Sequence, residues 1–341
     1  MKKEKLGLLF LFISILLFAA IPLSMLVFRA QAQVMDLHAR MPENGGWSTD
    51  IIKVEAGEPL HLRLTSDDVV HGFAIGKMDM ASLEIIPGEF VETTLTFDKP
   101  GRYTFYCNRW CGVNHWRMHG VIEVEGEVAE EEAEAPLYIR LGIDIDAPHI
   151  AKVIPTQPPS AERGEQFAAL LPEYATDRDT YLSTSPADFW IRLREEPGLI
   201  HLTDADLWDV VRWLWERQSD ADSLGIGLKL FVDMAAAAHG EQGKGDGVMV
   251  RGLPTMDHER MESRRVRPPD FTDPYVLLGA SPALLEGKIL RGGMGTGMPS
   301  FGAILTDKQI DAVVDYLYTI AWDSVEDQVS GVQETPLPPA D

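Results

Sequence analysis

The chain has 341 residues, of which 45% are hydrophobic, and a formal net charge of −23 at pH 7. This length predicts two or three domains, and the apolar content is sufficient for real hydrophobic cores. The negative charge argues against a nucleic-acid partner, because binding to a phosphate backbone needs lysine and arginine. It favours a cationic partner, or it serves only solubility.

An uncharged apolar run over residues 6–28 follows the basic start MKKEK. At about 1.5 Å per residue, a helix of this length crosses a hydrocarbon core of ~30 Å. The lysines before it predict a cytoplasmic N-terminus and an exported remainder. We therefore expect residues 1–33 to form a cytoplasmic end and a single transmembrane anchor. A cleaved signal peptide is the alternative, because AQA at 30–32 resembles a cleavage site.

Residues 34–126 have the pattern of short β-strands. Leucines alternate with polar residues in LHLRL (60–64), which is the period of a half-buried strand. The segments 94–97 and 102–106 are rich in β-branched and aromatic residues, and Pro-Gly pairs at 87–88 and 100–101 predict turns. Many short strands with such turns predict an all-β sandwich or barrel. The glutamate-rich residues 127–137 that follow predict a solvated acidic linker.

The C-terminal half shows a helical pattern that repeats itself. LTDADLWDVVRWLW (202–215) matches LTDKQIDAVVDYLY (305–318), and SPADFW (185–190) echoes SPALLE (281–286). Threonine in each LTD segment is placed to cap a helix with an apolar stripe. The repetition predicts an all-α half with two related helical domains in tandem. We expect them at residues 138–222 and 223–325, followed by a tail over residues 326–341.

The only two cysteines, Cys107 and Cys111, are followed closely by His115 and Met118. Outside the cytoplasm such a pair tends to form a disulfide. A disulfide needs neither the histidine nor the methionine, however, and zinc normally has no use for a thioether. Thiolate, imidazole and thioether together form a soft donor set, which favours copper. His71, at the end of another β segment, is placed to supply a further donor.

The segment from about residue 46 to 125 resembles the CuA domain of haem–copper oxidase subunit II. The resemblance rests on VVHGFAI, IPGEF and KPGRYTFYCNRWCGVNHWRMHGVIEV, which follow the order and spacing of that family. It implies a cupredoxin-like Greek-key barrel for residues 34–126. A single preceding span resembles the subunit II of B-type oxidases. The expected location is therefore the plasma membrane of a prokaryote, with the C-terminal domains outside the cytoplasm.

The same resemblance implies a binuclear copper centre with six donors. These are two bridging thiolates, Cys107 and Cys111; His71 and Met118 on one copper; and His115 and the backbone carbonyl of Arg109 on the other.

The resemblance has further implications for Arg109 and Trp47. Many relatives have, in place of Arg109, a glutamate that also reaches magnesium, so we expect no magnesium ligand from this side chain. Trp47 stands where relatives place an aromatic residue at the electron-entry surface. A packing tryptophan is the alternative interpretation of Trp47.

AAAAHGEQGKGDG (235–247), PPDF (268–271) and GMPSFG (297–302) follow the motifs of one haem-protein family in order. Through these segments, residues 223–325 resemble a class I cytochrome c. His239 and Met298 occupy the positions of the two axial haem ligands, but Ala235 and Ala238 replace the two cysteines, so thioether attachment of haem is impossible. Three interpretations stay open. The domain has lost haem and kept a structural role, it binds haem non-covalently through His239 and Met298, or the alanines are an alteration of a haem-binding parent.

The sequence thus predicts the electron-entry subunit of a respiratory haem–copper oxidase. It would take electrons from a soluble cytochrome c or cupredoxin and pass them through copper to haem in the membrane-bound subunit I. Oxygen reduction would occur in subunit I, so this chain would be a non-catalytic subunit of an oxidoreductase. The alternatives are the CuA subunit of a nitric oxide reductase and a membrane-anchored copper-binding protein without an enzymatic role.

Overall fold

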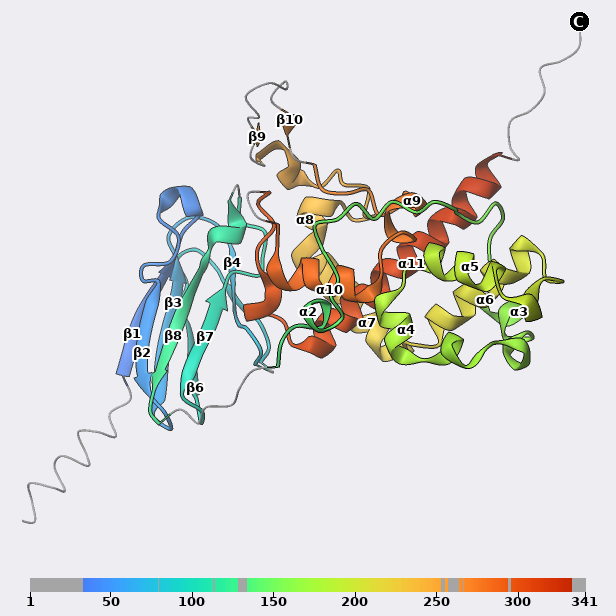
Figure 1. The fold of residues 1–341 in the computed structure, drawn as a ribbon. Coiled ribbons are helices and arrows are strands. Elements are labelled where there is room, and N and C mark those ends of the chain that lie inside the picture. The colour runs from blue at the N-terminus through green and yellow to red at the C-terminus, as the bar shows by residue number, and fades with distance from the viewer. Residues whose placement is uncertain are drawn as a thin grey trace, which may run out of the picture.

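The computed structural model describes residues 33–78, 80–112, 114–127, 134–252, 255–256, 264–265, 267–293 and 296–332. It shows a β domain beside a helical half (Figure 1). No helix in these ranges is long and apolar enough to cross a membrane. The predicted anchor, the middle of the acidic linker and the end of the predicted tail lie outside the described residues.

The strands of the β domain form two sheets, with the orders β1-β3-β6 and β2-β8-β7-β4-β5. Strand β1 runs parallel to β3 and β2 runs parallel to β8, whereas the other neighbours are antiparallel. The strands are β1 (Gln33–Ala39), β2 (Ile51–Glu55), β3 (Pro59–Ser66), β4 (His71–Ile75), β5 (Leu83–Ile85), β6 (Val91–Thr96), β7 (Gly101–Tyr106) and β8 (His119–Glu125).

One hydrophobic core fills the space between the two sheets. Strand β3 buries Leu60, Leu62 and Leu64 and leaves His61 and Arg63 between them partly exposed, as the alternation in the sequence predicts. Phe105 on β7 and Ile122 on β8 contribute to the same core from the other sheet. The predicted strands over 60–64 and 102–106 are confirmed, and the one predicted over 94–97 corresponds to β6.

The remaining described elements are mostly helices. The α-helices are α2 (Leu137–Arg140), α3 (Ala161–Glu165), α4 (Arg178–Ser183), α5 (Pro186–Arg194), α6 (Asp204–Glu216), α7 (Ala221–Leu230), α8 (Ala236–His239), α9 (Pro274–Leu277), α10 (Pro282–Arg291) and α11 (Asp307–Val332). The shorter helices are η1 (Pro42–Asn44), η2 (His115–Arg117), η3 (Ala168–Leu170), η4 (Glu173–Thr176), η5 (Pro197–Leu199), the π-helical η6 (Phe231–Ala235), η7 (Val248–Gly252) and η8 (Phe301–Ala303). Two short strands, β9 (Thr255–Met256) and β10 (Arg264–Arg265), pair with each other.

Both helices of the LTD repeat begin where the sequence predicts. Thr203 caps α6 and forms a capping box with Asp206. Thr306 accepts from the Gln309 backbone N–H at 3.3 Å at the start of α11, while the Gln309 side chain accepts from the Thr306 N–H at 2.9 Å. These reciprocal bonds satisfy backbone donors that the first turn of a helix leaves without partners.

The two predicted helical domains share one continuous core. Trp215 of α6 lies 6.2 Å from Tyr318 of α11, measured between ring centroids. The Tyr318 hydroxyl donates to the carbonyl of Ala280, just before α10, at 2.7 Å. Buried side chains from residues 145 to 325 belong to the same cluster. The helices therefore pack as one body, and their assignment to two cytochrome c-like domains stays a prediction.

The β domain and the helical half contact each other directly. The Lys77 backbone N–H, after β4, donates to the carbonyl of Ile304 at 2.8 Å. Gly76 approaches the same loop so closely that an added Cβ would lie 2.5 Å from the carbonyl oxygen of Ala303. Only glycine allows this approach. The close contact brings the ends of β4 and β7 to the face of the helical half that carries α8 and α10 (Figure 1).

Candidate copper site

Three neighbouring strands bring the predicted copper donors together. His71 begins β4, Cys107 follows β7, and Met118 precedes β8. Because β7 pairs with both β4 and β8, the loop from residue 107 to 118 lies beside the start of β4. The Cys107 backbone N–H donates to the Met118 carbonyl at 2.9 Å and closes this loop at its base.

The predicted donor atoms of the loop and of His71 lie close to one another. Cys107 Sγ lies 3.8 Å from His71 Nδ1 and 3.1 Å from the Arg109 carbonyl oxygen. Cys111 Sγ lies 3.3 Å from His115 Nδ1 and 3.8 Å from Met118 Sδ.

The donor atoms of His71, Cys107 and Cys111 all lie within 4.8 Å of one another. Both cysteines are free thiols, and both are buried. The structure thus brings all six predicted donors together, and soft donors in this arrangement fit copper.

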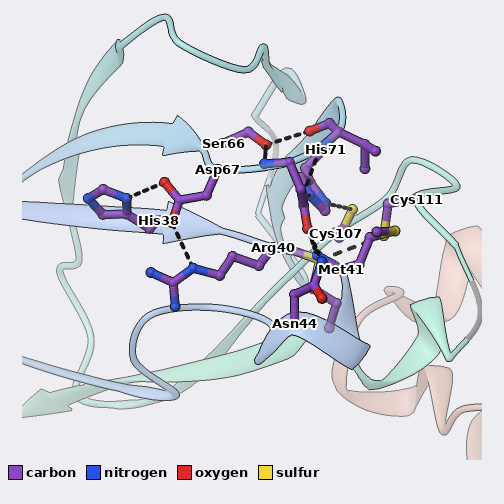
Figure 2. Close-up of polar contacts among 12 residues, drawn as sticks. His38, Arg40, Met41, Asn44, Ser66, Asp67, His71, Cys107 and Cys111 are labelled. Carbon is purple, nitrogen blue, oxygen red and sulfur yellow. Dashed lines mark hydrogen bonds and ion pairs between the residues drawn. The ribbon is translucent and has the colours of Figure 1, made fainter.

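Asp68 holds the imidazole of His71 in position. Its Oδ1 lies 2.8 Å from His71 Nε2, while Nδ1 of the same ring faces Cys107. Its Oδ2 accepts from the Met41 backbone N–H at 2.7 Å and from Asn44 at 2.9 Å. Figure 2 labels Met41 and Asn44 near His71 and the two cysteines. A carboxylate that fixes the free nitrogen of a histidine is a common support for metal ligands. Sequence reasoning missed Asp68, although it precedes His71 by three residues.

The protonation states of the cluster are perturbed by its own contacts. The hydrogen bond from Cys111, assisted by the two histidines, holds the pKa of Cys107 well below its usual range. The pKa of Cys111 is raised by the same hydrogen bond and by burial. Burial alone would lower the pKa of His71, but its contacts with Cys107 and Asp68 outweigh burial and raise it. The lowered pKa of Cys107 favours its thiolate, which is the form of cysteine that binds metal ions.

Gly72 allows β4 to approach the loop. An added Cβ at this position would lie 2.1 Å from the side-chain oxygen of Asn108. Its backbone N–H also donates to Cys107 Sγ at 3.4 Å, a bond that stabilises a thiolate. The Arg109 side chain, from which we expect no magnesium ligand, forms an ion pair with Glu84 at 2.6 Å.

Two tryptophans close to the site, Trp47 and Trp110, differ in exposure. Trp47 is only 4% exposed and packs edge-on against Phe73 and Phe105, with ring centroids 5.9 and 5.6 Å away. This position supports the packing role for Trp47, and its electron-entry role stays a prediction. Trp110, which sequence reasoning did not single out, is 37% exposed and lies edge-on to the His115 ring at 5.7 Å.

A second group of predicted ligands lies at the boundary between the domains. His239 and Met298 line a cavity of about 500 Å³, and so do Ala235 and Ala238. The His239 ring stacks on Phe271 with centroids 4.6 Å apart. Burial lowers the pKa of His239 to about 4, and the nearby Pro269 carbonyl offsets only part of this effect. The imidazole is therefore neutral at physiological pH.

Known proteins match the β domain. Residues 48–125 match the family model of the cytochrome c oxidase subunit II periplasmic domain. Two curated relatives, both cytochrome c oxidase subunit 2 and both from Thermus thermophilus, are each 36% identical over 80 residues. The β domain is homologous to the periplasmic domain of cytochrome c oxidase subunit II. The predicted cupredoxin-like β domain is thereby confirmed, and the homology implies copper binding.

The matches cover only part of each protein. The 80 matched residues make up 24% of this chain and 58% and 47% of the two relatives, or about half of their length. A chain of a haem–copper terminal oxidase dimer is 29% identical, covers 36% of this chain and 99% of its own, and has a TM-score of 0.24. The periplasmic domain of subunit II of cytochrome oxidase from Bradyrhizobium japonicum is 19% identical, covers 28% and 84%, and has a TM-score of 0.23.

Proposed function

We propose that this chain is the electron-entry subunit of a respiratory haem–copper terminal oxidase. The single observation that carries the proposal is the cluster of two thiols, two imidazoles, one thioether and one carbonyl in a domain homologous to subunit II. Electrons would enter from a soluble cytochrome c or cupredoxin and leave to subunit I, where oxygen is reduced. The apolar run over residues 6–28 would anchor the chain in the plasma membrane, with the β domain outside the cytoplasm.

The proposed cofactor is a pair of copper ions. Cys107 and Cys111 would bridge them, and the other four predicted donors would complete the two coordination shells. Two copper ions that share two thiolates carry one electron over both nuclei, with little change in geometry between oxidation states. No cleft for a substrate is needed for such a relay, because the subunit only accepts and delivers electrons.

The protein's own contribution is to fix the donors in place. Asp68 orients His71, and the backbone N–H of Gly72 donates to Cys107. Five of the six donor residues belong to one short loop that is tied between neighbouring strands. Such support keeps the donor positions the same in both oxidation states and so limits the reorganisation that slows electron transfer.

A redox partner can reach the copper cluster through Trp110. This side chain is partly exposed and contacts the imidazole of His115, whereas Trp47 is covered by the β-domain core. The acidic surface of the chain suits a basic donor, and the rate would then decrease with ionic strength.

The proposal is tested by purifying the chain with its membrane partners. Co-purification with a multispanning subunit that carries haem and copper, together with oxygen consumption, is the expected result. Consumption of nitric oxide in place of oxygen would assign the chain to a nitric oxide reductase instead. Copper binding without a redox partner or electron uptake would reduce the chain to a copper-binding protein.

A further inference from the structure

The cavity between the domains has walls from both of them. On the β-domain side it is lined by Thr104, Tyr106 and Val121, and by the copper-site loop with His115 and Trp116. Thr104 and Val121 face each other across the β7–β8 ladder. On the helical side the lining is mainly apolar and includes Leu230 of α7, Phe231 of η6, Phe271 before α9, Ile289 of α10 and Leu317 of α11. A mainly apolar cavity of about 500 Å³ has the size of a pocket for a small organic ligand or cofactor.

Two potential metal ligands enter this cavity from separate segments. His239 ends α8, and among the described residues its buried Nδ1 has no hydrogen-bond partner. Met298 is held by a backbone bridge to Gly293 and by a bond from its N–H to the Thr296 hydroxyl at 3.3 Å. Imidazole and thioether are a ligand pair that proteins use for haem iron. The cavity is larger than a single ion needs, and its mainly apolar lining suits an apolar macrocycle that carries the metal.

The same cavity lacks the residues that would attach such a group covalently. Ala235 and Ala238 line it with methyl groups, and both cysteines of the chain lie in the copper site. A bound macrocycle would therefore be retained only by its two axial bonds and by burial of its apolar surface. Burial of apolar area favours the bound state, so the loss of one wall weakens binding.

We propose that the β domain forms one wall of a non-covalent haem pocket, so that haem binding depends on Thr104, Val121 and the copper-site loop as well as on His239 and Met298. The two domains then build one joint redox site, in which the haem pocket adjoins the copper donors. The inference deepens the proposed function and rests on it only for the direction of electron flow. The pocket itself is tested by binding.

The test is a spectroscopic titration of the purified, copper-loaded full-length chain with haemin. We expect stoichiometric binding, a Soret band of low-spin haem, and the charge-transfer band of methionine-ligated ferric iron. His239→Ala and Met298→Leu should each lose the low-spin spectrum.

The role of the β domain is tested by filling its side of the cavity. Thr104→Trp places a large ring against the pocket from β7 and should weaken haem binding at least tenfold, about 1.4 kcal/mol. Thr96→Trp is the matched control, because Thr96 is exposed on β6 in the other sheet, and it should bind haem like the parent. Val121→Met is a gentler change of the same wall and should weaken binding in the same direction.

The outcomes separate this inference from the proposed function. Absence of haem binding, stoichiometric Cu(I) binding by His239 instead of haem, or equal haem affinity of the parent, Thr104→Trp and Val121→Met would overturn the shared pocket. The copper spectrum recorded in the same samples reports on the proposed function alone. If that spectrum persists while haem binding fails, the electron-entry proposal stands and the joint pocket is rejected.

Discussion

The copper cluster and the interdomain cavity are two candidate ligand sites that are built in opposite ways. In the cluster, the donor atoms touch one another at 3.1–3.8 Å and come from one loop and one strand. In the cavity, His239 and Met298 come from segments 59 residues apart (298 − 239) and share a mainly apolar pocket with the neighbouring domain. The cluster is preformed by local spacing, whereas the cavity exists only after both domains have packed. Copper binding by the cluster should therefore be sensitive to the loss of a single donor residue. Ligand binding in the cavity should be sensitive to changes at the interface between the domains.

The largest effect is expected from a bridging thiol. Cys107→Ser replaces the thiolate that contacts both His71 and the Arg109 carbonyl. A hydroxyl is a poor ligand for copper, so the binuclear spectrum and electron uptake should disappear. Optical and EPR spectra of the copper-loaded variant measure this loss, and circular dichroism verifies the fold. A variant that keeps the parent spectrum would contradict a bridging role for Cys107.

A smaller effect is expected from the residue that orients a ligand. Asp68→Asn weakens the support of His71 Nε2 and should lower copper affinity about 10- to 100-fold, as observed for such contacts in other metal sites. Competition with a copper chelator gives the affinity. The neighbouring Asp67 bonds to His38 and Arg40 rather than to His71 (Figure 2), so Asp67→Asn is the matched control and should bind copper normally. Equal losses in both variants would exclude an orienting role.

Substitutions of Trp47 and Trp110 should distinguish a role in packing from a role in electron exchange. Trp47→Leu removes a buried ring from the β-domain core and should cost roughly 2 kcal/mol of stability, with copper retained. Trp110→Leu removes an exposed ring beside His115 and should slow electron exchange with a partner severalfold, with little loss of stability. Chemical denaturation and stopped-flow kinetics measure the two quantities. Slower electron exchange in Trp47→Leu alone would restore the electron-entry role to that residue.

The smallest effect concerns the helical half. Burial raises the pKa of Glu286 to about 7 from an ordinary 4.5, with a contribution from the charges of Asp311 and Asp307. The folded state therefore holds this proton more tightly than the unfolded state, and stability should fall as the pH rises from about 4.5 through 7. Glu286→Gln should lessen this decline and raise the melting temperature at pH 8 but not at pH 4. The half-buried Asp315, whose pKa is raised to about 6, contributes to the decline that remains.

The control for this change is an exposed glutamate. Glu165→Gln on α3 should leave the pH dependence of the melting temperature unaltered. An equally steep decline in the parent and in Glu286→Gln would show that other groups cause it.

Much of the copper site could be predicted because its signal is local. Five of its six donor residues lie between positions 107 and 118, and the strand pattern on both sides fixes where the loop begins and ends. The N-caps at Thr203 and Thr306 were predictable for the same reason, because a capping box spans only four residues.

The rest depends on contacts between distant segments. The burial of Trp47 follows from its packing on Phe73 and Phe105, which no pattern around residue 47 indicates. The shared core of the helical half and the wall that Thr104 contributes to the cavity depend on how whole elements pack. Periodicity shows which face of an element is apolar, but it does not show which other element covers that face.

The central claim is that two neighbouring thiols hold a pair of copper ions that share one electron. EPR spectroscopy of the copper-loaded, oxidised chain tests it most directly. We predict a hyperfine pattern from one unpaired electron spread equally over two copper nuclei, accompanied by a purple colour. A four-line spectrum of isolated mononuclear copper without that colour would contradict the claim and the electron-entry function that depends on it.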